Sequence, residues 1–335
     1  MDHAELQKKI NEELGADSVG SLVPIGKGRV RDGLSTGSLS LNKALSGNPL
    51  VGFAWGKTVE IYGPEQAGKT TLCLHCISEL QKLEHASGRP LPALFVDAEH
   101  ALDLEYASNL VDLGNLSIAQ PDSGEKALET VRIAVANGYK LVVVDSVAAL
   151  TPMDELSARI TDQQVGLQAR MISKAMRVLC GVVAKQNAIV IFTNQIRMKI
   201  GVMFSNPETT PGGMALKFFT SYRLELRSPR GGAKTEKSIT GATEESGKYV
   251  NVKVVKNKVY PPYRSASFFV RYGIGIDKEQ DIVDYLKNRG DFDGSSKVQL
   301  DTGKSYGAPG LLRAMRESED VRESAVRYLI SDDSV

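Results

Sequence analysis

The clearest pattern in this chain is a set of short apolar runs that do not alternate with polar residues. They lie at 58–62, 93–97, 116–119, 141–144 and 189–193. Runs without alternation are typical of strands buried on both faces, as in parallel sheets. Between them, apolar residues recur with helical spacing at 70–85, 125–137 and 166–186. The pattern predicts an α/β fold with crossover helices and a mostly parallel central sheet.

The pattern changes toward both ends of the chain. Three later runs, at 222–226, 250–256 and 266–271, lie closer together, and we expect them to be antiparallel and joined by turns. Leu6, Ile10 and Leu14 recur every four residues, which predicts an amphipathic helix over 2–14, followed by a Gly-rich basic linker at 25–33.

The composition changes again after about 277. Short amphipathic helices, such as one at 281–288, are expected among Gly/Ser-rich turns, and the last 19 residues carry six acids and two bases. We therefore expect three parts: an N-terminal helix and linker (1–33), an α/β core (34–275), and a small α+β C-terminal domain with a short acidic tail (276–335).

Net charge restricts the partners that the whole surface can attract. The 335 residues carry a formal charge of +1, so nucleic-acid binding requires a local basic patch. Residues 221–264 provide one, with ten Lys/Arg against four Glu, although a solvated charged face is the usual reason for such a run. No stretch of 18 apolar residues and no signal-peptide pattern occur, which predicts a cytoplasmic protein with no membrane partner.

Two of the three cysteines form a C-x-x-C pair. Cys73 and Cys76 flank His75, a spacing found in metal and redox sites. No second C-x-x-C or H-x-x-H occurs, and the pair lies in a predicted apolar helix. Buried thiols that act as small hydrophobes are therefore favoured.

The most specific motif is G-x-x-x-x-G-K-T, which follows a predicted strand and precedes a predicted helix. It consists of Gly63, Pro64, Glu65, Gln66, Ala67, Gly68, Lys69 and Thr70, with Thr71 next. Glycines let the backbone N–H groups point at phosphate oxygens, and the helix N-terminus adds partial positive charge. The lysine can reach the β- and γ-phosphates, and the Thr70 hydroxyl can ligate Mg²⁺. The motif predicts binding of a nucleoside triphosphate.

Acids follow two other predicted strands. Asp145 ends the run at 141–144, where a magnesium ligand is expected beside a phosphate loop, although a capping or salt-bridge role is also open. Asp97 and Glu99 follow the run at 93–97, and one of them could activate water for hydrolysis. Their spacing alone does not choose between them, or between catalysis and a surface loop.

A long irregular segment follows the strand at 189–193. It begins at Asn194 and Gln195, and a polar side chain there could sense the γ-phosphate. Residues 196–213 then mix cations, thioethers, one aromatic ring and turn residues. Arg197, Met198, Lys199, Met203 and Phe204 would suit single-stranded nucleic acid, with cations for phosphate and apolar wedges for bases. A solvated hairpin is the alternative.

Together these residues resemble the bacterial RecA recombinase family over about 35–275. The matching segments are STGSLSLNKAL (35–45), VEIYGPEQAGKTTL (59–72), VDAEHALD (96–103), VVVDSVAALTP (142–152), NQIRMKIGVMF (194–204), NPETTPGG (206–213) and VKVVKNK (252–258). The resemblance implies a RecA-like P-loop NTPase core. The implied activity is a DNA-dependent ATPase that forms helical filaments on single-stranded DNA and exchanges strands with duplex DNA in recombination and repair.

The resemblance also assigns roles to residues. Glu99 is similar to the water-activating glutamate, and Gln195 to the residue that couples the γ-phosphate to the DNA loop. Asp103 and Tyr106 match adenine contacts, Lys256 and Lys258 a lysine pair that reaches ATP across a subunit interface, and Phe218 an interface residue. Segments 157–165 and 196–213 resemble the two DNA-binding loops. The implied DNA contacts are Arg170, Ser173, Arg177, Arg197, Met198, Lys199, Ile200, Gly201, Phe204, Gly212 and Gly213.

The implied cofactors are ATP and Mg²⁺. The implied partners are DNA, further copies of the chain, a self-cleaving repressor of the SOS response, and single-strand-binding or loader proteins. The chain departs from the family at Pro211, Met214 and Asn251, where threonine, asparagine and a basic residue are usual. The sequence leaves chromosomal or phage origin and repressor cleavage open. A ring helicase on the same core is the alternative function, and an ATP-driven switch without catalysis is disfavoured by the intact Lys69, Asp145 and Glu99.

Overall fold

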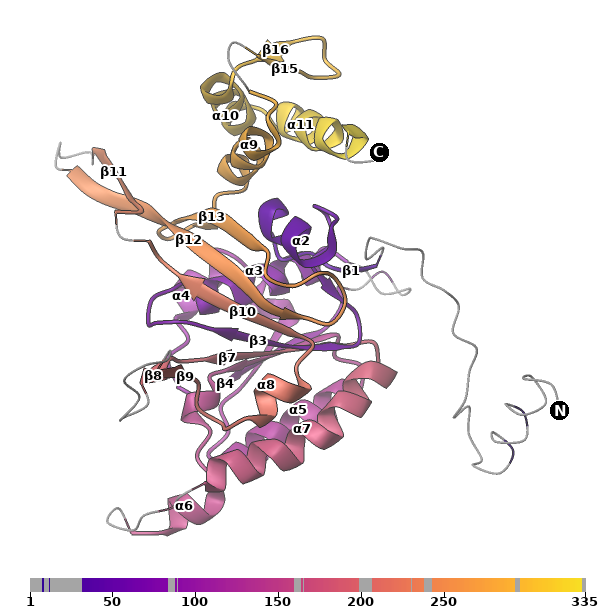
Figure 1. Ribbon diagram of the computed structural model, residues 1–335, viewed down its shortest axis with the longest axis vertical. Coiled ribbons are helices and arrows are strands. Elements are labelled where there is room, and N and C mark those ends of the chain that lie inside the picture. Colours follow the sequence, from indigo (N-terminus) through magenta and orange to yellow (C-terminus); the bar gives the residue numbers. More distant parts are fainter. Residues whose placement is uncertain are drawn as a thin grey trace.

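A ten-stranded sheet forms the centre of the protein in a computed structural model (Figure 1). The structure describes residues 8, 12, 32–83, 88, 90–159, 164, 166–198, 207–229, 231–237, 243–292 and 296–332. The predicted helix at 2–14 and most of the linker at 25–33 therefore lie outside the described residues. Lys8 and Glu12 alone are described there; they are helical and form an exposed ion pair of 3.9 Å.

The sheet is parallel in its middle and antiparallel at one side. Its order is β14-β13-β12-β10-β3-β7-β6-β4-β5, and β11 pairs with β12. The strands from β10 to β5 pair in parallel. Their bounds are β3 Lys57–Tyr62, β4 Ala93–Asp97, β5 Leu116–Ala119, β6 Leu141–Asp145, β7 Ile189–Asn194 and β10 Tyr222–Arg227. The predicted α/β class and mostly parallel sheet are confirmed.

The later strands only partly follow the prediction. β12 (Thr243–Asn257) and β13 (Ser265–Arg271) are antiparallel neighbours, and β11 (Ala233–Lys237) and β14 (Gly275–Ile276) extend this side. The run at 222–226 was expected to be antiparallel. As β10 it pairs antiparallel with β12 but parallel with β3, so it joins the two halves of the sheet.

Helices cover both faces of the sheet (Figure 1). The long ones are α3 Lys69–Gln81, α5 Gly124–Ala136 and α7 Leu167–Lys185, and α3 ends four residues before its predicted end at 85. Shorter elements are β1 Gly33–Leu34, α2 Leu39–Ser46, β2 Phe53–Ala54, α4 Leu104–Ser108, η1 Leu113–Asn115, η2 Val147–Ala149, α6 Met153–Ser157, β8 Arg197–Met198, β9 Glu208–Thr209 and α8 Ala215–Phe219.

Two hydrophobic clusters, one on each face, explain why the runs of the central strands do not alternate. The prediction is wrong for the run at 116–119, because β5 is an edge strand and Ile118 is 41% exposed. In β6, Leu141 and Val143 belong to the cluster under α2 and α3, whereas Val142 and Val144 belong to the cluster under α5 and α7. All four side chains have no exposed surface. Cys73 and Cys76 are buried in the first cluster, as predicted. Among the described residues, no cluster of three or more His, Cys, Asp or Glu is arranged to hold a metal ion.

A third hydrophobic cluster lies in the C-terminal segment. It is built from α9 (Lys278–Arg289), α10 (Ala308–Glu317) and α11 (Glu319–Asp332), with β15 (Val298–Gln299) paired to β16 (Ser305–Tyr306). Most of the segment predicted as a short acidic tail is helical, because Glu319–Asp332 forms α11 and buries Ala325 and Leu329. We propose that this unit is a separate domain that begins near residue 276.

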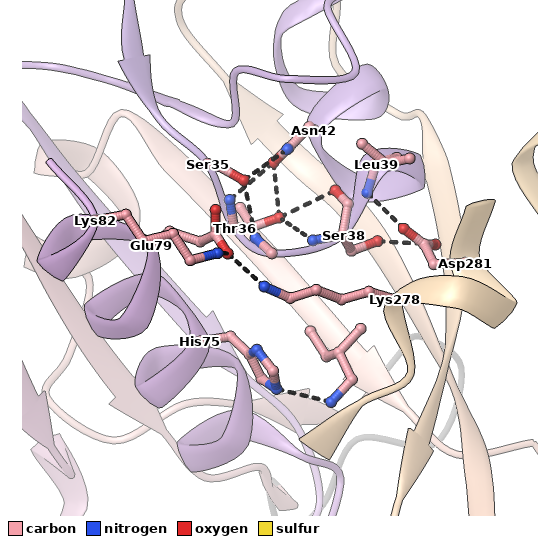
Figure 2. Close-up of polar contacts among 12 residues, drawn as sticks. Ser35, Thr36, Ser38, Leu39, Asn42, His75, Glu79, Lys82, Lys278 and Asp281 are labelled. Carbon is pink, nitrogen blue, oxygen red and sulfur yellow. Dashed lines mark hydrogen bonds and ion pairs between the residues drawn. The ribbon is translucent and has the colours of Figure 1, made fainter. Parts of the chain in front are cut away.

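Polar contacts fasten this unit to the core, as Figure 2 shows. The carboxylate of Asp281, on α9, accepts hydrogen bonds from the Ser38 hydroxyl (3.2 Å) and the Leu39 backbone N–H (2.5 Å) at the start of α2. Lys278 forms an ion pair of 2.7 Å with Glu79 of α3, the helix that begins at the phosphate loop. The C-terminal unit therefore contacts both α2 and α3 directly.

Asp281 makes a testable contribution to pH dependence. Burial raises the pKa of its carboxyl group to about 6, although the hydrogen bonds from α2 oppose the shift. Because this pKa is above the unfolded value, the stability linked to Asp281 is full below about pH 4 and is lost as pH rises through 6. We expect the difference in unfolding free energy between wild type and Asp281→Asn to fall by about 2 kcal/mol from pH 4 to 7. Urea unfolding at a series of pH values measures it, and a constant difference would contradict the assignment.

Candidate nucleotide and nucleic-acid site

The glycines of the phosphate loop are required by the geometry between β3 and α3. A Cβ on Gly63 would lie 2.3 Å from the Leu226 carbonyl oxygen, so β10 leaves no room for a side chain. Gly68 has a φ of 86°, a left-handed conformation that glycine adopts without strain, and α3 begins at the next residue. The Lys69 ammonium donates to the carbonyl oxygens of Gly63 (3.1 Å) and Pro64 (2.7 Å). It therefore lies along the loop that the sequence predicts to bind phosphate.

Thr70 and Asp145 meet at the carboxyl end of the parallel strands. The Thr70 hydroxyl, in the first turn of α3, donates to a carboxylate oxygen of Asp145 at 2.6 Å. The Thr193 hydroxyl, on β7, donates to the other oxygen. Burial raises the pKa of Asp145, and these two hydrogen bonds oppose the rise. Burial also lowers the pKa of Lys69, against the attraction of the carboxylates of Asp145 and Glu99.

The two candidate acids after β4 occupy different environments. Asp97 is buried and accepts hydrogen bonds from the backbone of the next turn and from the Gln120 amide, so its oxygens maintain the local fold. Glu99 is exposed, and its Oε1 accepts from the Ser146 hydroxyl and, at 3.2 Å, from the Gln195 side chain. This arrangement favours Glu99 as the group that faces a reacting water.

A cavity of about 280 Å³ lies beside the phosphate loop. Its lining residues are Gln66, Ala67, Gly68, Lys69, Thr70, Thr71, Tyr106, Lys248, Val270, Arg271, Tyr272 and Gly273. The Tyr106 hydroxyl lies 3.0 Å from that of Thr71. Asp103, the other predicted adenine contact, does not line this cavity; its carboxylate caps α4 by accepting from the Tyr106 backbone N–H at 3.0 Å.

The described ends of the second predicted loop form a short hairpin. Arg197 and Met198 lie on β8, which pairs with β9, and both side chains are exposed. Lys199, Ile200, Gly201 and Phe204 lie outside the described residues. The hairpin follows Gln195 directly, so the side chain that contacts Glu99 also leads into the loop.

The other end of this loop packs against α7. A Cβ on Gly212 would lie 2.8 Å from a methyl carbon of Ile172, and one on Gly213 would lie 2.8 Å from the Ala169 side chain. Arg170, Ser173 and Arg177 recur along the same face of α7, and both arginines are exposed. Of the first predicted loop, 157–165, only 157–159 and 164 are described.

Lys256, Lys258 and Phe218 cluster at the end of α8. The Lys256 ammonium donates to the carbonyl oxygens of Lys217 (2.6 Å) and Phe218 (2.9 Å), and Lys258 donates to Phe218 at 3.3 Å. Burial, with the nearby charges of Lys258 and Arg223, lowers the pKa of Lys256 to about 8. The Phe218 side chain is 67% exposed, and neither lysine lines the nucleotide cavity of its own chain.

The sequence analysis missed a buried charged pair behind the loop. Glu60, in the middle of β3, has no exposed surface and forms an ion pair of 2.5 Å with Arg223 on β10. The Asn194 side chain donates to Glu60 and to the Pro211 carbonyl oxygen, each at 3.1 Å. The sequence feature that could have indicated this pair is Glu60 itself, a carboxylate in an otherwise apolar strand. The same contacts show that Pro211, which lacks an N–H, still holds the loop through its carbonyl.

The fold and the site define a P-loop nucleotide-binding ATPase with a mostly parallel sheet. Residues 3–277 match the family model of the RecA N-terminal domain. Protein RecA of Allochromatium vinosum is 50% identical over 278 residues, which are 82% of this chain and 76% of that protein. Protein RecA of Borrelia hermsii is 42% identical over 327 residues, 94% and 87% of the two chains. The chain belongs to the RecA family.

A solved structure supports the fold independently. The crystal structure of the RadB recombinase superposes with a TM-score of 0.52 at 24% identity, over 72% of this chain and 98% of that chain. Membership of the RecA family makes this chain an ATP-dependent recombinase. Proteins of this family are DNA-dependent ATPases that bind DNA and form filaments. The comparisons do not favour the helicase alternative. Within the part of the chain that the structure describes, no helix has the length and hydropathy needed to cross a membrane.

Proposed function

We propose that ATP hydrolysis at this site drives exchange of DNA strands in a filament of this chain. The observation that carries the proposal is the contact between Glu99 and Gln195. It connects the phosphate-loop side of the sheet to β8, where the predicted DNA-binding loop begins. A change at the nucleotide can therefore reach the loop through one side chain.

The residues present fit ATP and Mg²⁺. The loop that ends at Gly68 and the N-terminus of α3 would hold the phosphates, and Lys69 would contact the β- and γ-phosphates. The oxygens of Thr70 and Asp145, already 2.6 Å apart, suit a hard cation. When bound, the metal would neutralise charge on the phosphates, while Glu99 would orient and deprotonate water and Tyr106 would lie against the base.

The DNA contacts are proposed for two separate surfaces. Single-stranded DNA would lie along Arg197, Arg170 and Arg177, which present exposed cations near the second loop. The phosphate backbone of duplex DNA would lie against the mouth of a cavity of about 920 Å³ between α2, the sheet and α9, lined in part by Lys43, Arg227, Lys253 and Arg264. Asn251 lines it too, where the family usually has a basic residue, so we expect weaker duplex binding.

The cluster of Phe218, Lys256 and Lys258, in which Phe218 and Lys258 are exposed, is proposed as the contact with the nucleotide of the next copy. A head-to-tail contact of this kind does not close on itself and can extend into a helical filament. Partners such as a self-cleaving repressor or a loader protein stay predictions of the family resemblance.

The test of the proposed function is ATP hydrolysis with and without single-stranded DNA, with duplex DNA as the comparison. Strong stimulation by single strands is expected, because the Glu99–Gln195 contact couples the two sites. Hydrolysis indifferent to DNA would contradict the coupling and indicate a motor or switch with another partner.

Replacing Arg197 tests the DNA surface separately. Arg197→Ala is expected to weaken single-strand binding several-fold and to flatten its salt dependence, because one phosphate contact is removed. Affinity for nucleotide should not change. Fluorescence anisotropy with labelled single strands across a salt titration measures the effect, and Lys185→Ala, an exposed lysine at the far end of α7, is the control. Equal DNA affinity for Arg197→Ala and wild type at all salt concentrations would rule out the loop assignment.

A further inference from the structure

One lysine from the antiparallel side of the sheet lies at the phosphate loop. Lys248 is on β12, and its ammonium donates to the Gln66 carbonyl oxygen at 2.6 Å. Val250 is two residues further along the same strand. One of its methyl carbons lies 3.4 Å from the position that a Cβ on Gly68 would occupy. Alternate residues of a strand share a face, so β12 presents positions 248 and 250 to the loop.

The position of Lys248 is held from both sides of the strand. In the sheet, Lys248 lies opposite Val270 of β13 on one side and opposite Ala233 of β11 on the other. The neighbouring Tyr249 points away from the loop, and its hydroxyl donates to Asp284 of α9 at 3.0 Å. The backbone that carries Lys248 is therefore fixed by three elements, and the flexible part is the side chain alone.

The surroundings of Lys248 are those of an anion site. It lines the same cavity as Lys69, Thr70 and Thr71, and no acidic residue appears among the described residues that line it. Lys69 and Arg271 are the other cations in this lining, and Arg271 pairs with Asp277 outside it at 3.1 Å. An ammonium beside the N-terminus of α3 adds to the positive potential there.

We propose that Lys248 binds the polyphosphate of the nucleotide directly, from the same protomer as the phosphate loop. The proposal rests on the proposed ATP site and deepens it, because it adds a cation from a strand that the loop motif does not include. The side chain exchanges its hydrogen bond to the Gln66 carbonyl for one to phosphate. The ligand feature that it recognises is the phosphate chain, not the base. The competing role is a structural clamp that only holds the loop.

The first test compares affinities for ATP and adenosine, both measured by competition against a fluorescent ADP analogue. Lys248→Met is expected to weaken ATP binding about tenfold, since a charge-assisted contact to phosphate is lost, and to leave adenosine binding unchanged. Lys248→Arg should recover most of the ATP affinity. Lys140→Met is the matched control, because the Lys140 ammonium also donates to a backbone carbonyl (Gln186, 2.8 Å) but lies away from the cavity. ATP affinity within twofold of wild type for Lys248→Met, or an equal loss for adenosine, would overturn the proposal.

The second test separates a phosphate contact from a clamp in the unaltered protein. Lysines are acylated with and without ATP, in the absence of DNA, and the modified positions are quantified by mass spectrometry. ATP is expected to protect Lys69 and Lys248 several-fold and to leave Lys140 unchanged. Protection of Lys69 without protection of Lys248 would overturn this inference while the proposed function stands. Protection of neither would count against the ATP site itself.

Discussion

Lys69→Ala is expected to reduce ATP hydrolysis at least about a hundredfold and to abolish strand exchange, while the fold stays intact. In the part of the chain that the structure describes, the Lys69 ammonium donates to two loop carbonyls, so its loss removes no core packing. A preorganised charge aimed at the transferring phosphoryl group is worth two to three orders of magnitude in rate. Steady-state hydrolysis with saturating single-stranded DNA measures the loss.

The thermal unfolding midpoint of Lys69→Ala serves as the internal control and should stay close to that of wild type. Lys140→Ala, which removes a half-buried lysine remote from the loop, should hydrolyse ATP normally. Wild-type turnover in Lys69→Ala would show that the phosphate loop is not the site of hydrolysis.

Arg223→Met is expected to lower the free energy of unfolding by about 3–5 kcal/mol. The substitution leaves the Glu60 carboxylate, which has no exposed surface, without its ion-pair partner in the sheet. It also removes the guanidinium that stacks 4.7 Å from the Tyr62 ring centre. Urea unfolding of the two proteins measures the difference.

The double variant Glu60→Gln/Arg223→Met separates charge burial from packing. Removing both charges should recover a large part of the loss, because the penalty is the uncompensated carboxylate. Arg132→Met, which breaks the exposed pair with Glu129 on α5, should change stability little. An Arg223→Met protein as stable as Arg132→Met would mean that the buried pair contributes nothing.

The strand positions could be predicted because burial on both faces leaves a direct mark in the sequence. The run at 141–144 is apolar at consecutive positions because α3 covers one side of the sheet and α5 and α7 cover the other. The phosphate loop was equally predictable, because its glycine spacing, lysine and threonine serve one local structure. Features that depend on residues close together in the sequence could therefore be predicted.

Features that depend on contacts between residues far apart in the sequence could not be predicted. Glu60 and Arg223 are 163 residues apart, and Lys248 and Gln66 are 182 apart, so no local pattern joins them. The sequence could not show whether Asp97 or Glu99 faces the reacting water. The structure favours Glu99, because the backbone N–H groups of the following turn donate hydrogen bonds to the Asp97 carboxylate. The helix at Glu319–Asp332 was not predicted, because the segment is rich in charged residues. Ala325 and Leu329 of this helix are buried because it packs against α9 and α10.

Strand β12 has a consequence for how this protein can vary over evolution. Residues 250, 252 and 254 of β12 are fully buried, whereas Asn251 and Lys253, which alternate with them, are exposed. A shift of one residue would exchange these two sets, moving Asn251 and Lys253 into the core and valines onto the exposed face. Between positions 248 and 254, we therefore expect insertions and deletions among relatives to come in even numbers or to be absent.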